Sequence, residues 1–160
     1  MVKARTVFEM GSGYGYSTAW FARAVQENGG GRVHHVVWDS DLSARARRHL
    51  EKLGYASLME YHVAEAIETL QETPGQFDLI FNDINKECYP ESLPLIYAKL
   101  RPGGVLIVDN LLWHGQVLDP HIQDPNTEGV RELTRQLTTD LAWISTLIPI
   151  RDGMLLAYRR

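Results

Sequence analysis

Residues 7–17 read VFEMGSGYGYS, a short apolar run that enters a cluster of glycines and continues into a helix-forming segment. Gly11, Gly13 and Gly15 suit a tight turn, because glycine adopts positive φ angles and lets another group approach its backbone closely. The exposed amides at the start of the following helix favour a negative or carboxylate group. The stretch therefore predicts a strand, a ligand-binding turn and a helix, although such a turn can also be purely structural.

Strand and helix patterns alternate along the rest of the chain, which predicts a mostly parallel sheet covered on both faces. We expect strands at residues 6–10, 33–38, 58–63, 77–81 and 105–108, and helices at 17–26, 42–53, 66–71 and 127–138, with one more helix ended by Pro102, Gly103 and Gly104. Only Arg151, Asp152 and Gly153 separate the last two apolar runs, 143–150 and 154–158. So short a connection joins antiparallel strands. The prediction is a Rossmann-like, doubly wound α/β sheet of seven strands with a C-terminal antiparallel hairpin.

The composition of the chain fits one domain over residues 1–160, with 44% hydrophobic residues for a single core. A net charge of −4 gives no basic field for nucleic acid or membrane surfaces. Cys88 is the only cysteine, which excludes an internal disulfide and fits a reducing cytoplasm. No apolar stretch approaches the roughly 18 residues of a membrane span, and residues 1–6 lack the apolar core of a signal peptide.

Two residues beside the glycine turn favour a nucleoside ligand other than NAD. The dinucleotide fingerprint GxGxxG has glycine or alanine where this chain has Tyr16, and we expect a tyrosine there to crowd the helix against the strand. Glu9 ends the first strand, where an acid would repel a pyrophosphate and attract the ammonium group of a methionine moiety.

Acids after the second and third strands are candidates for contacts with the nucleoside. Asp39 is placed to accept hydrogen bonds from ribose hydroxyls. Asp41 competes for this role, although a helix cap or first-turn acid is its ordinary interpretation. Glu65 could accept from an adenine amino group while Ala66 packs on the ring; a solvated acid in the first helical turn is the alternative for Glu65.

Oxygen-bearing side chains follow the fourth and fifth strands. Asp83, Asp109 and Asn110 fall at the carboxyl ends of neighbouring strands, the edge at which open α/β sheets bind ligands. Two carboxylates and an amide oxygen suit Mg²⁺, Mn²⁺ or Ca²⁺. The alternative is that such residues cap turns. Lys86, three residues after Asp83, could reach the same edge and act as a general base, or be an ordinary surface lysine.

Taken together, these segments resemble the class I, metal-dependent O-methyltransferases, the group of catechol and caffeoyl-CoA O-methyltransferases and their small bacterial relatives. The resemblance covers nearly the whole chain and rests on VFEMGSGYGYSTAWFA (7–22), FDLIFNDINKECYPE (77–91), LRPGGVLIVDNLLWHGQV (100–117) and PIRDGMLLAYRR (149–160). It implies a class I methyltransferase fold, S-adenosylmethionine (SAM) as cofactor and a divalent cation, most simply Mg²⁺.

The resemblance also implies roles for individual residues. Gly11, Gly13 and Ser17 would hold the methionine end of SAM and Asp39 the ribose. Lys86 matches the catalytic lysine of the family, and Trp113 lies on a loop beside the acceptor pocket. Asp83, Asp109 and Asn110 match the metal ligands. The whole candidate cofactor-binding set is Glu9, Gly11, Ser12, Gly13, Gly15, Tyr16, Ser17, Asp39, Glu65, Ala66 and Asp83.

Three features depart from the family pattern. Asn85 replaces the second acid of the motif after the fourth strand, and Ala64 stands where glycine is common. The family's helices before the first strand, which help to cover the site and often build a dimer, are expected to be absent, because the first strand starts close to Met1.

The expected reaction is methyl transfer from SAM to a hydroxyl of a catechol-like or phenolic small molecule. Two other functions stay open: methylation of an RNA hydroxypyrimidine, and SAM binding with weak or no catalysis. No membrane partner is expected, nucleic acid is disfavoured by the charge, and a homodimer is compatible with the resemblance.

Overall fold

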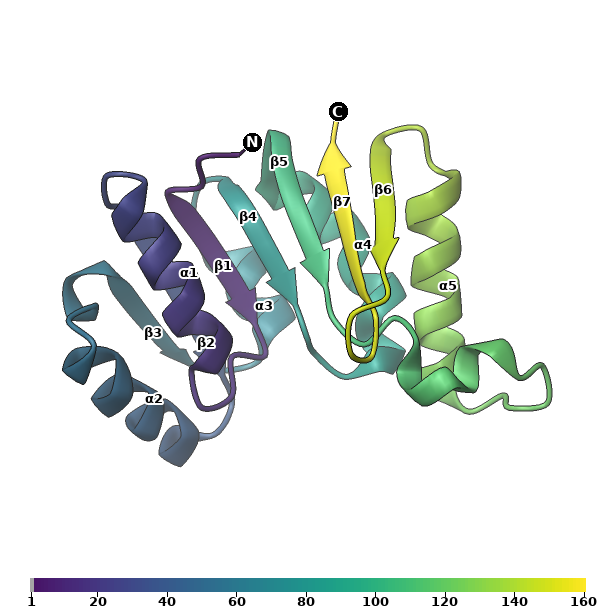
Figure 1. Ribbon diagram of the computed structural model, residues 1–160, viewed down its shortest axis with the longest axis horizontal. Helices are drawn as coiled ribbons and strands as arrows, with labels where there is room; N and C mark the ends of the chain where they lie inside the picture. The colour runs from purple at the N-terminus through teal and green to yellow at the C-terminus, as the bar shows by residue number, and fades with distance from the viewer. Residues whose placement is uncertain (1) are drawn as a thin grey trace.

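The computed structural model describes residues 2–160 as one seven-stranded sheet with helices on both faces (Figure 1). The strands are β1 (Thr6–Met10), β2 (Arg32–Val37), β3 (Met59–Val63), β4 (Phe77–Asn82), β5 (Leu100–Val108), β6 (Trp143–Ile148) and β7 (Met154–Arg159). The helices are α1 (Tyr16–Glu27), α2 (Ser40–Lys52), α3 (Ala66–Glu72), α4 (Tyr89–Lys99) and α5 (Pro125–Thr139), with short 3₁₀ turns η1 (Ala56–Leu58), η2 (Lys86–Cys88) and η3 (Trp113–Leu118). Met1, which belongs to the segment 1–6 discussed above, lies outside the described residues.

The strand order is β3-β2-β1-β4-β5-β7-β6, so the chain reverses direction across the sheet between β1 and β4. Strands β1 to β5 pair in parallel, whereas β7 pairs antiparallel with both β5 and β6. The predicted doubly wound sheet with its C-terminal hairpin is therefore confirmed. Ligands of open α/β sheets bind at the point of reversal, outside the carboxyl ends of the strands.

Alternating side chains of the strands point to opposite faces of the sheet and pack into two separate hydrophobic cores. Val7 and Val33 face α1 and α2, where they pack with Ala22 and Leu50. On the other face, residues of β1, β4, β5 and β7 pack with α3, α4 and α5 around Phe8, Ile80, Leu106, Ile96 and Leu133. Figure 1 shows α1 and α2 on the near side of the sheet and α4 behind it. Since both faces are covered, the polar groups at the strand ends are held on a rigid frame.

Capping side chains mark the starts of three helices. Asp39, Glu65 and Asp124 each accept hydrogen bonds from backbone amides of the first turn of α2, α3 and α5. These caps satisfy donors that have no partner inside the helix. Helix α5 begins at Pro125, two residues earlier than expected, because proline fits the first helical position.

Strand β5 is longer than the sequence predicted. It begins at Leu100, which pairs with Phe77, and the register shifts before Leu79. Pro102 and Gly103 therefore lie inside the strand, where the irregular pairing tolerates a residue without an amide proton. Strand β6 ends at Ile148 because Pro149 follows it.

No helix within residues 2–160 is both long and apolar enough to cross a lipid bilayer.

Candidate functional site

A cavity of about 900 Å³ opens at the carboxyl ends of β1, β2 and β4, beside the point where the strand order reverses. Its lining includes residues from the glycine turn, from the loops after β2 and β3, and from the segment after β4. Seven of the residues predicted from the sequence line it: Gly11, Gly13, Glu65, Ala66, Asp83, Lys86 and Trp113. Predicted cofactor, catalytic and substrate residues thus meet in one cavity.

The glycine turn brings the backbone of the β1–α1 connection against the end of β4. Gly11 has a φ of 86°, and a Cβ atom there would lie 2.3 Å from the carbonyl oxygen of Asp83. Gly13 has a φ of 50° and open space where a Cβ would stand. Gly15, with a φ of 83°, precedes the first residue of α1. The glycines therefore serve both functions expected of them, close packing at Gly11 and an uncovered backbone at Gly13.

The side chains of Ser12 and Tyr16 have opposite environments. The Ser12 hydroxyl is buried, donates to the carbonyl of Glu9 (3.1 Å) and accepts from the amide of Val36 (2.9 Å), so it joins the turn to β2. The Tyr16 side chain is 75% exposed. The expectation that Tyr16 crowds the helix against the strand was wrong, because its position on α1 directs the side chain to solvent. Neither residue lines the cavity.

Glu9 lies fully buried at the end of β1. Its Oε2 atom accepts a hydrogen bond from the Thr18 hydroxyl, which also contacts Nδ1 of His35 (3.1 Å). The Oε1 atom of Glu9 has no hydrogen-bond partner among the described residues. Burial raises the pKa of Glu9 to about 7, and the hydrogen bond from Thr18 only partly opposes this shift. One buried acceptor without a partner among the described residues thus lies directly before the glycine turn, although Glu9 is not among the residues that line the cavity.

The acids after β2 and β3 cap helices in this structure. Oδ1 of Asp39 accepts from the amides of Asp41 (2.8 Å) and Leu42 (2.9 Å), so Asp39 is the cap of α2 and Asp41 is a first-turn acid. Oε2 of Glu65 accepts from the amide of Glu68 (2.7 Å). Glu65 lines the cavity, whereas Asp39 is exposed to solvent and is not among the lining residues.

An ion pair occupies the part of the cavity that follows β4. Nζ of Lys86 lies 2.6 Å from Oδ1 of Asp83 and 3.2 Å from the carbonyl oxygen of Ile84. Lys86 is only 6% exposed, and its ammonium group lies over the rings of Tyr89 (5.0 Å) and Trp113 (5.7 Å). The prediction that Lys86 reaches the edge with Asp83 is borne out by these distances, and it is not an ordinary surface lysine.

Asp83 and Asp109 end adjacent strands and influence each other. Burial raises the pKa of Asp83; Lys86 lowers it, and the negative charge of Asp109 raises it further. The backbone amide of Asp109 donates to the carbonyl of Asn82 (3.2 Å), which continues the pairing of β4 with β5. The ammonium group of Lys86, 2.6 Å from Asp83, is the positive charge that balances this carboxylate in the structure.

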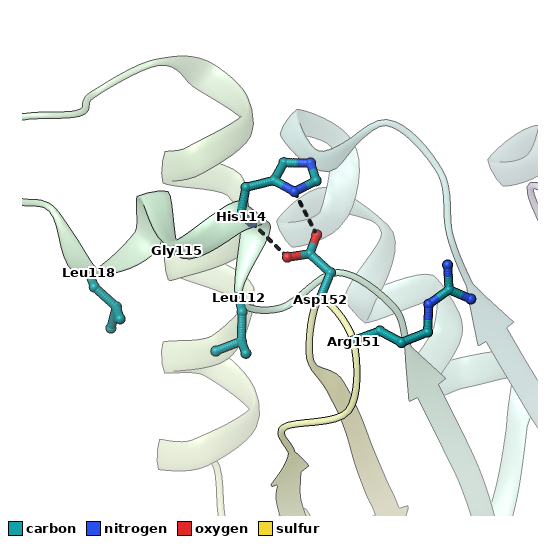
Figure 2. A pocket seen from close by; sticks show the side chains of 6 residues that line it. All are labelled: Leu112, His114, Gly115, Leu118, Arg151 and Asp152. Atoms are coloured by element: carbon teal, nitrogen blue, oxygen red, sulfur yellow. Dashed lines mark hydrogen bonds and ion pairs between the residues drawn. The ribbon is translucent and has the colours of Figure 1, made fainter.

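Asn110 is fixed by the C-terminal hairpin. It has a φ of 61°, and its side-chain amide nitrogen donates to Oδ2 of Asp152 (3.3 Å). Oδ1 of Asp152 accepts from the backbone amide of His114 (2.6 Å), and Oδ2 lies 3.9 Å from Nδ1 of the His114 ring. Figure 2 shows Asp152 pointing from the hairpin toward His114, beside a smaller cavity of about 450 Å³. The hairpin thereby holds the loop that carries Asn110 and Trp113.

The comparisons with known proteins agree with this geometry. The family model described as O-methyltransferase matches residues 1–160. A catechol O-methyltransferase from Niastella koreensis is 31% identical, over 98% of this chain and 74% of the relative. This chain belongs to the O-methyltransferase family.

Two solved structures of O-methyltransferases have the same fold. That of TomG from Streptomyces achromogenes, described as involved in tomaymycin synthesis and in complex with SAM, is 32% identical with a TM-score of 0.88, over 98% of this chain and 74% of that one. One from Bacillus cereus, in complex with SAH, is 28% identical with a TM-score of 0.89, over 99% of this chain and 75% of that one. The predicted enzyme class, a SAM-dependent O-methyltransferase, is confirmed at the level of the family.

Sequence reasoning missed three residues at the site of this O-methyltransferase. Trp38, 80% exposed, lines the cavity directly before Asp39; its place at the end of an apolar run was a usable signal. The buried Tyr89 hydroxyl donates to the carbonyls of Asp109 (2.9 Å) and Asn82 (3.3 Å), joining the ends of β4 and β5. Asp152 was recognised only as part of a turn, because nothing local in the sequence shows that the hairpin folds against Asn110.

Proposed function

We propose that this chain transfers the methyl group of SAM to a hydroxyl oxygen of a catechol-like or phenolic small molecule, with the assistance of a divalent cation. One observation carries the proposal: a single cavity is lined by the glycine turn on one side and by Asp83, Lys86 and Trp113 on the other. A nucleoside-binding turn and an acid–base pair therefore share one space. We further propose that residues 1–160 act as one methyltransferase domain.

The cofactor would lie between the glycine turn and the loops after β2 and β3. Gly11 and Gly13 leave the backbone accessible, and the unpaired Oε1 of Glu9 is an acceptor for the ammonium group of the methionine moiety. Trp38 and Ala66 provide apolar surface for the adenine ring, with Glu65 beside them. When bound, SAM supplies an electrophilic methyl group on a sulfonium.

The residues after β4 and β5 fit a hard divalent cation. Asp83 and Asp109 offer carboxylate oxygens, and their mutual repulsion favours a positive charge at this edge. Asn110 donates to Asp152 through its nitrogen, which leaves its side-chain oxygen available as a ligand. Bound there, Mg²⁺ would lower the pKa of an acceptor hydroxyl.

Lys86 is the proposed general base. Asp83 and Ile84 accept hydrogen bonds from Nζ at 2.6 Å and 3.2 Å, which holds the Lys86 amine at this edge of the cavity. As a general base, this amine would take the proton of the acceptor hydroxyl as the oxygen attacks the methyl group. The aromatic ring of Trp113, beside Lys86, suits a planar aromatic acceptor.

A radiolabel assay tests the proposal. The chain, SAM, catechol and Mg²⁺ should give methylated catechol, and EDTA should abolish the product. Calorimetry with SAM alone is the parallel measurement. Binding of SAM without turnover on catechol would contradict the proposed acceptor and the catalytic role, and absence of SAM binding would contradict the whole proposal.

A further inference from the structure

Three metal-binding side chains lie together on the outer strands of the sheet, outside the cavity described above. His34 comes from β2, and Glu60 and His62 come from β3. The parallel register pairs His34 with Glu60 and Val36 with His62, so the three side chains share one face of the sheet. Among the described residues, this is the group of histidines, cysteines and acids that meets the distances of a metal site.

The donor atoms are spaced for a single ion. Nδ1 of His34 lies 3.1 Å from Nε2 of His62, which is 3.7 Å from Oε1 of Glu60. One donor atom from each of the three side chains lies within 4.8 Å of the other two. Zinc–nitrogen bonds of about 2.0–2.1 Å in tetrahedral geometry place two ligand atoms about 3.3 Å apart. The nitrogen atoms of the two histidines, 3.1 Å apart, lie close to this separation, and the Glu60 carboxylate is 3.7 Å from His62.

The packing around the histidines fixes their orientation. The His34 ring stacks on Phe8 (5.5 Å between centroids) and on His62 (5.3 Å), and contacts the edge of Phe77 (5.3 Å). An apolar surround of this kind holds ligands rigidly and strengthens electrostatic attraction to a cation. Glu60 is half exposed, so one side of the cluster is open to solvent and to an entering ion.

Local charges permit an ion at this position. The carboxylate of Glu60 supplies negative charge beside both rings, and Arg32 is the neighbouring cation that opposes binding. Without an ion, the close nitrogen atoms of His34 and His62 share a hydrogen bond.

We propose that His34, Glu60 and His62 form a binding site for a borderline divalent metal ion such as Zn²⁺, separate from the catalytic cavity. Two imidazoles and a carboxylate suit zinc, whereas Mg²⁺ prefers a set made of oxygens alone. Water completes the coordination shell on the open side. The ion links β3, at the edge of the sheet, to its neighbour β2, and thereby stabilises that edge. This site does not depend on the proposed function.

The test uses the full chain stripped of metal with EDTA and titrated with Zn²⁺ in a calorimeter, in excess Mg²⁺. The Mg²⁺ occupies sites built from oxygens and leaves the histidine site free for zinc. Variants His62→Gln and Glu60→Gln each remove one ligand. His49→Gln, an exposed histidine on α2, is the matched control. Circular dichroism checks that each variant is folded.

Wild type and His49→Gln should bind one Zn²⁺ with the same affinity, and Zn²⁺ should raise the melting temperature of both. His62→Gln and Glu60→Gln should each lower the affinity for Zn²⁺ by more than the roughly tenfold to 100-fold loss that is typical of an outer-sphere substitution. If His62→Gln fails to fold, the exposed Glu60→Gln decides the matter. A zinc isotherm of either folded variant equal to that of wild type would overturn the proposal.

Discussion

Glu9 shows how a single buried side chain can link the stability of the fold to its ligand site. Its carboxyl group is completely buried, with one oxygen held by Thr18 and the other without a partner among the described residues. An ionised carboxylate in such a place loses hydration that its hydrogen bonds do not replace. The pKa of about 7 is the consequence. A cationic group of a bound ligand would supply the missing partner.

The substitution Glu9→Gln should therefore change how stability depends on pH. The folded state binds the Glu9 proton more tightly than the unfolded state, whose pKa is near 4.5, so the wild type loses stability as pH rises from 4.5 through about 7. Over that interval Glu9→Gln should gain about 3 kcal/mol in free energy of unfolding relative to wild type. Urea denaturation without ligand at pH 4.5 and pH 8 measures this. A difference between the two proteins that does not change with pH would contradict the assignment.

Lys86 is the residue on which the proposed proton transfer depends. Lys86→Ala should lower kcat by about 10² to 10⁴-fold, the usual contribution of a general base. The dissociation constant of SAM should stay unchanged, because Lys86 is assigned to the acceptor side of the cavity. Methyl-transfer kinetics and calorimetry measure the two effects, with the exposed Lys52→Ala as the matched control. A wild-type kcat in Lys86→Ala would remove Lys86 from the proposed mechanism.

The sequence predicted residues that stand directly after strands, because strand ends of a parallel sheet share one edge. Lys86 could be placed because it follows Asp83 by less than one helical turn. Asp152 and Tyr89 could not, because their contacts with Asn110 and Asp109 depend on how the hairpin and α4 dock. The catalytic, cofactor, substrate and metal roles of all the candidate residues stay predictions.

At the scale of elements, the β1–α1 turn must pass close to the end of β4. Gly11 allows this approach, since an added Cβ would lie 2.3 Å from the Asp83 carbonyl oxygen. Gly75 has a similar φ of 91°, but a Cβ there would stand in open space. An alanine at Gly75 therefore meets only the backbone strain, whereas an alanine at Gly11 meets the strain and a steric clash. The close contact couples the geometry of the cofactor turn to the position of Asp83.

Gly11→Ala should consequently destabilise the chain by about 1 to 3 kcal/mol more than Gly75→Ala, the range typical of overpacking. It should also weaken SAM binding, whereas Gly75→Ala should not. Urea denaturation and calorimetry on the two variants measure these effects. Equal stabilities for the two variants would show that the turn does not need its close approach to β4.

The C-terminal hairpin supports the loop after β5 through Asp152. Asp152→Ala removes the acceptor for the His114 amide and for the Asn110 side chain, and should cost about 1 to 3 kcal/mol of stability, as expected for hydrogen bonds to a charged group. It should also weaken activation by Mg²⁺, because Asn110 loses its support. Thermal unfolding and a Mg²⁺ titration of activity test this, with the exposed Asp41→Ala as control. Unchanged Mg²⁺ dependence would separate the hairpin from the site.

Element types could be predicted well from hydrophobic periodicity and turn residues, and the boundaries less well. The expected 6–10 strand is β1, because Gly11 ends the apolar run at once. The start of β5 at Leu100 was missed because a proline and two glycines resemble a loop, and only pairing with Phe77 makes them part of the sheet. The histidine cluster was also missed because it depends on strand pairing. Only the β2–β3 register brings His34 and His62 together.

For the whole molecule, the reversal of strand order between β1 and β4 places the glycine turn next to Asp83, which follows β4. Asp109 and Asn110 follow the neighbouring strand β5 and are not among the residues that line the cavity. The two halves of the sheet thus contribute different parts of the proposed reaction, one the cofactor and the other the cation and the base. The proposed function requires that both parts face one cavity at the same time.

The most direct test is a crystal structure of the chain with S-adenosylhomocysteine and Mn²⁺, in which anomalous scattering locates the metal. We predict the nucleoside in the cavity beside Gly11 and Gly13, and a manganese peak bonded to oxygens of Asp83, Asp109 and Asn110. A nucleoside bound elsewhere, or those three side chains directed away from one another with no metal peak between them, would contradict the proposed site.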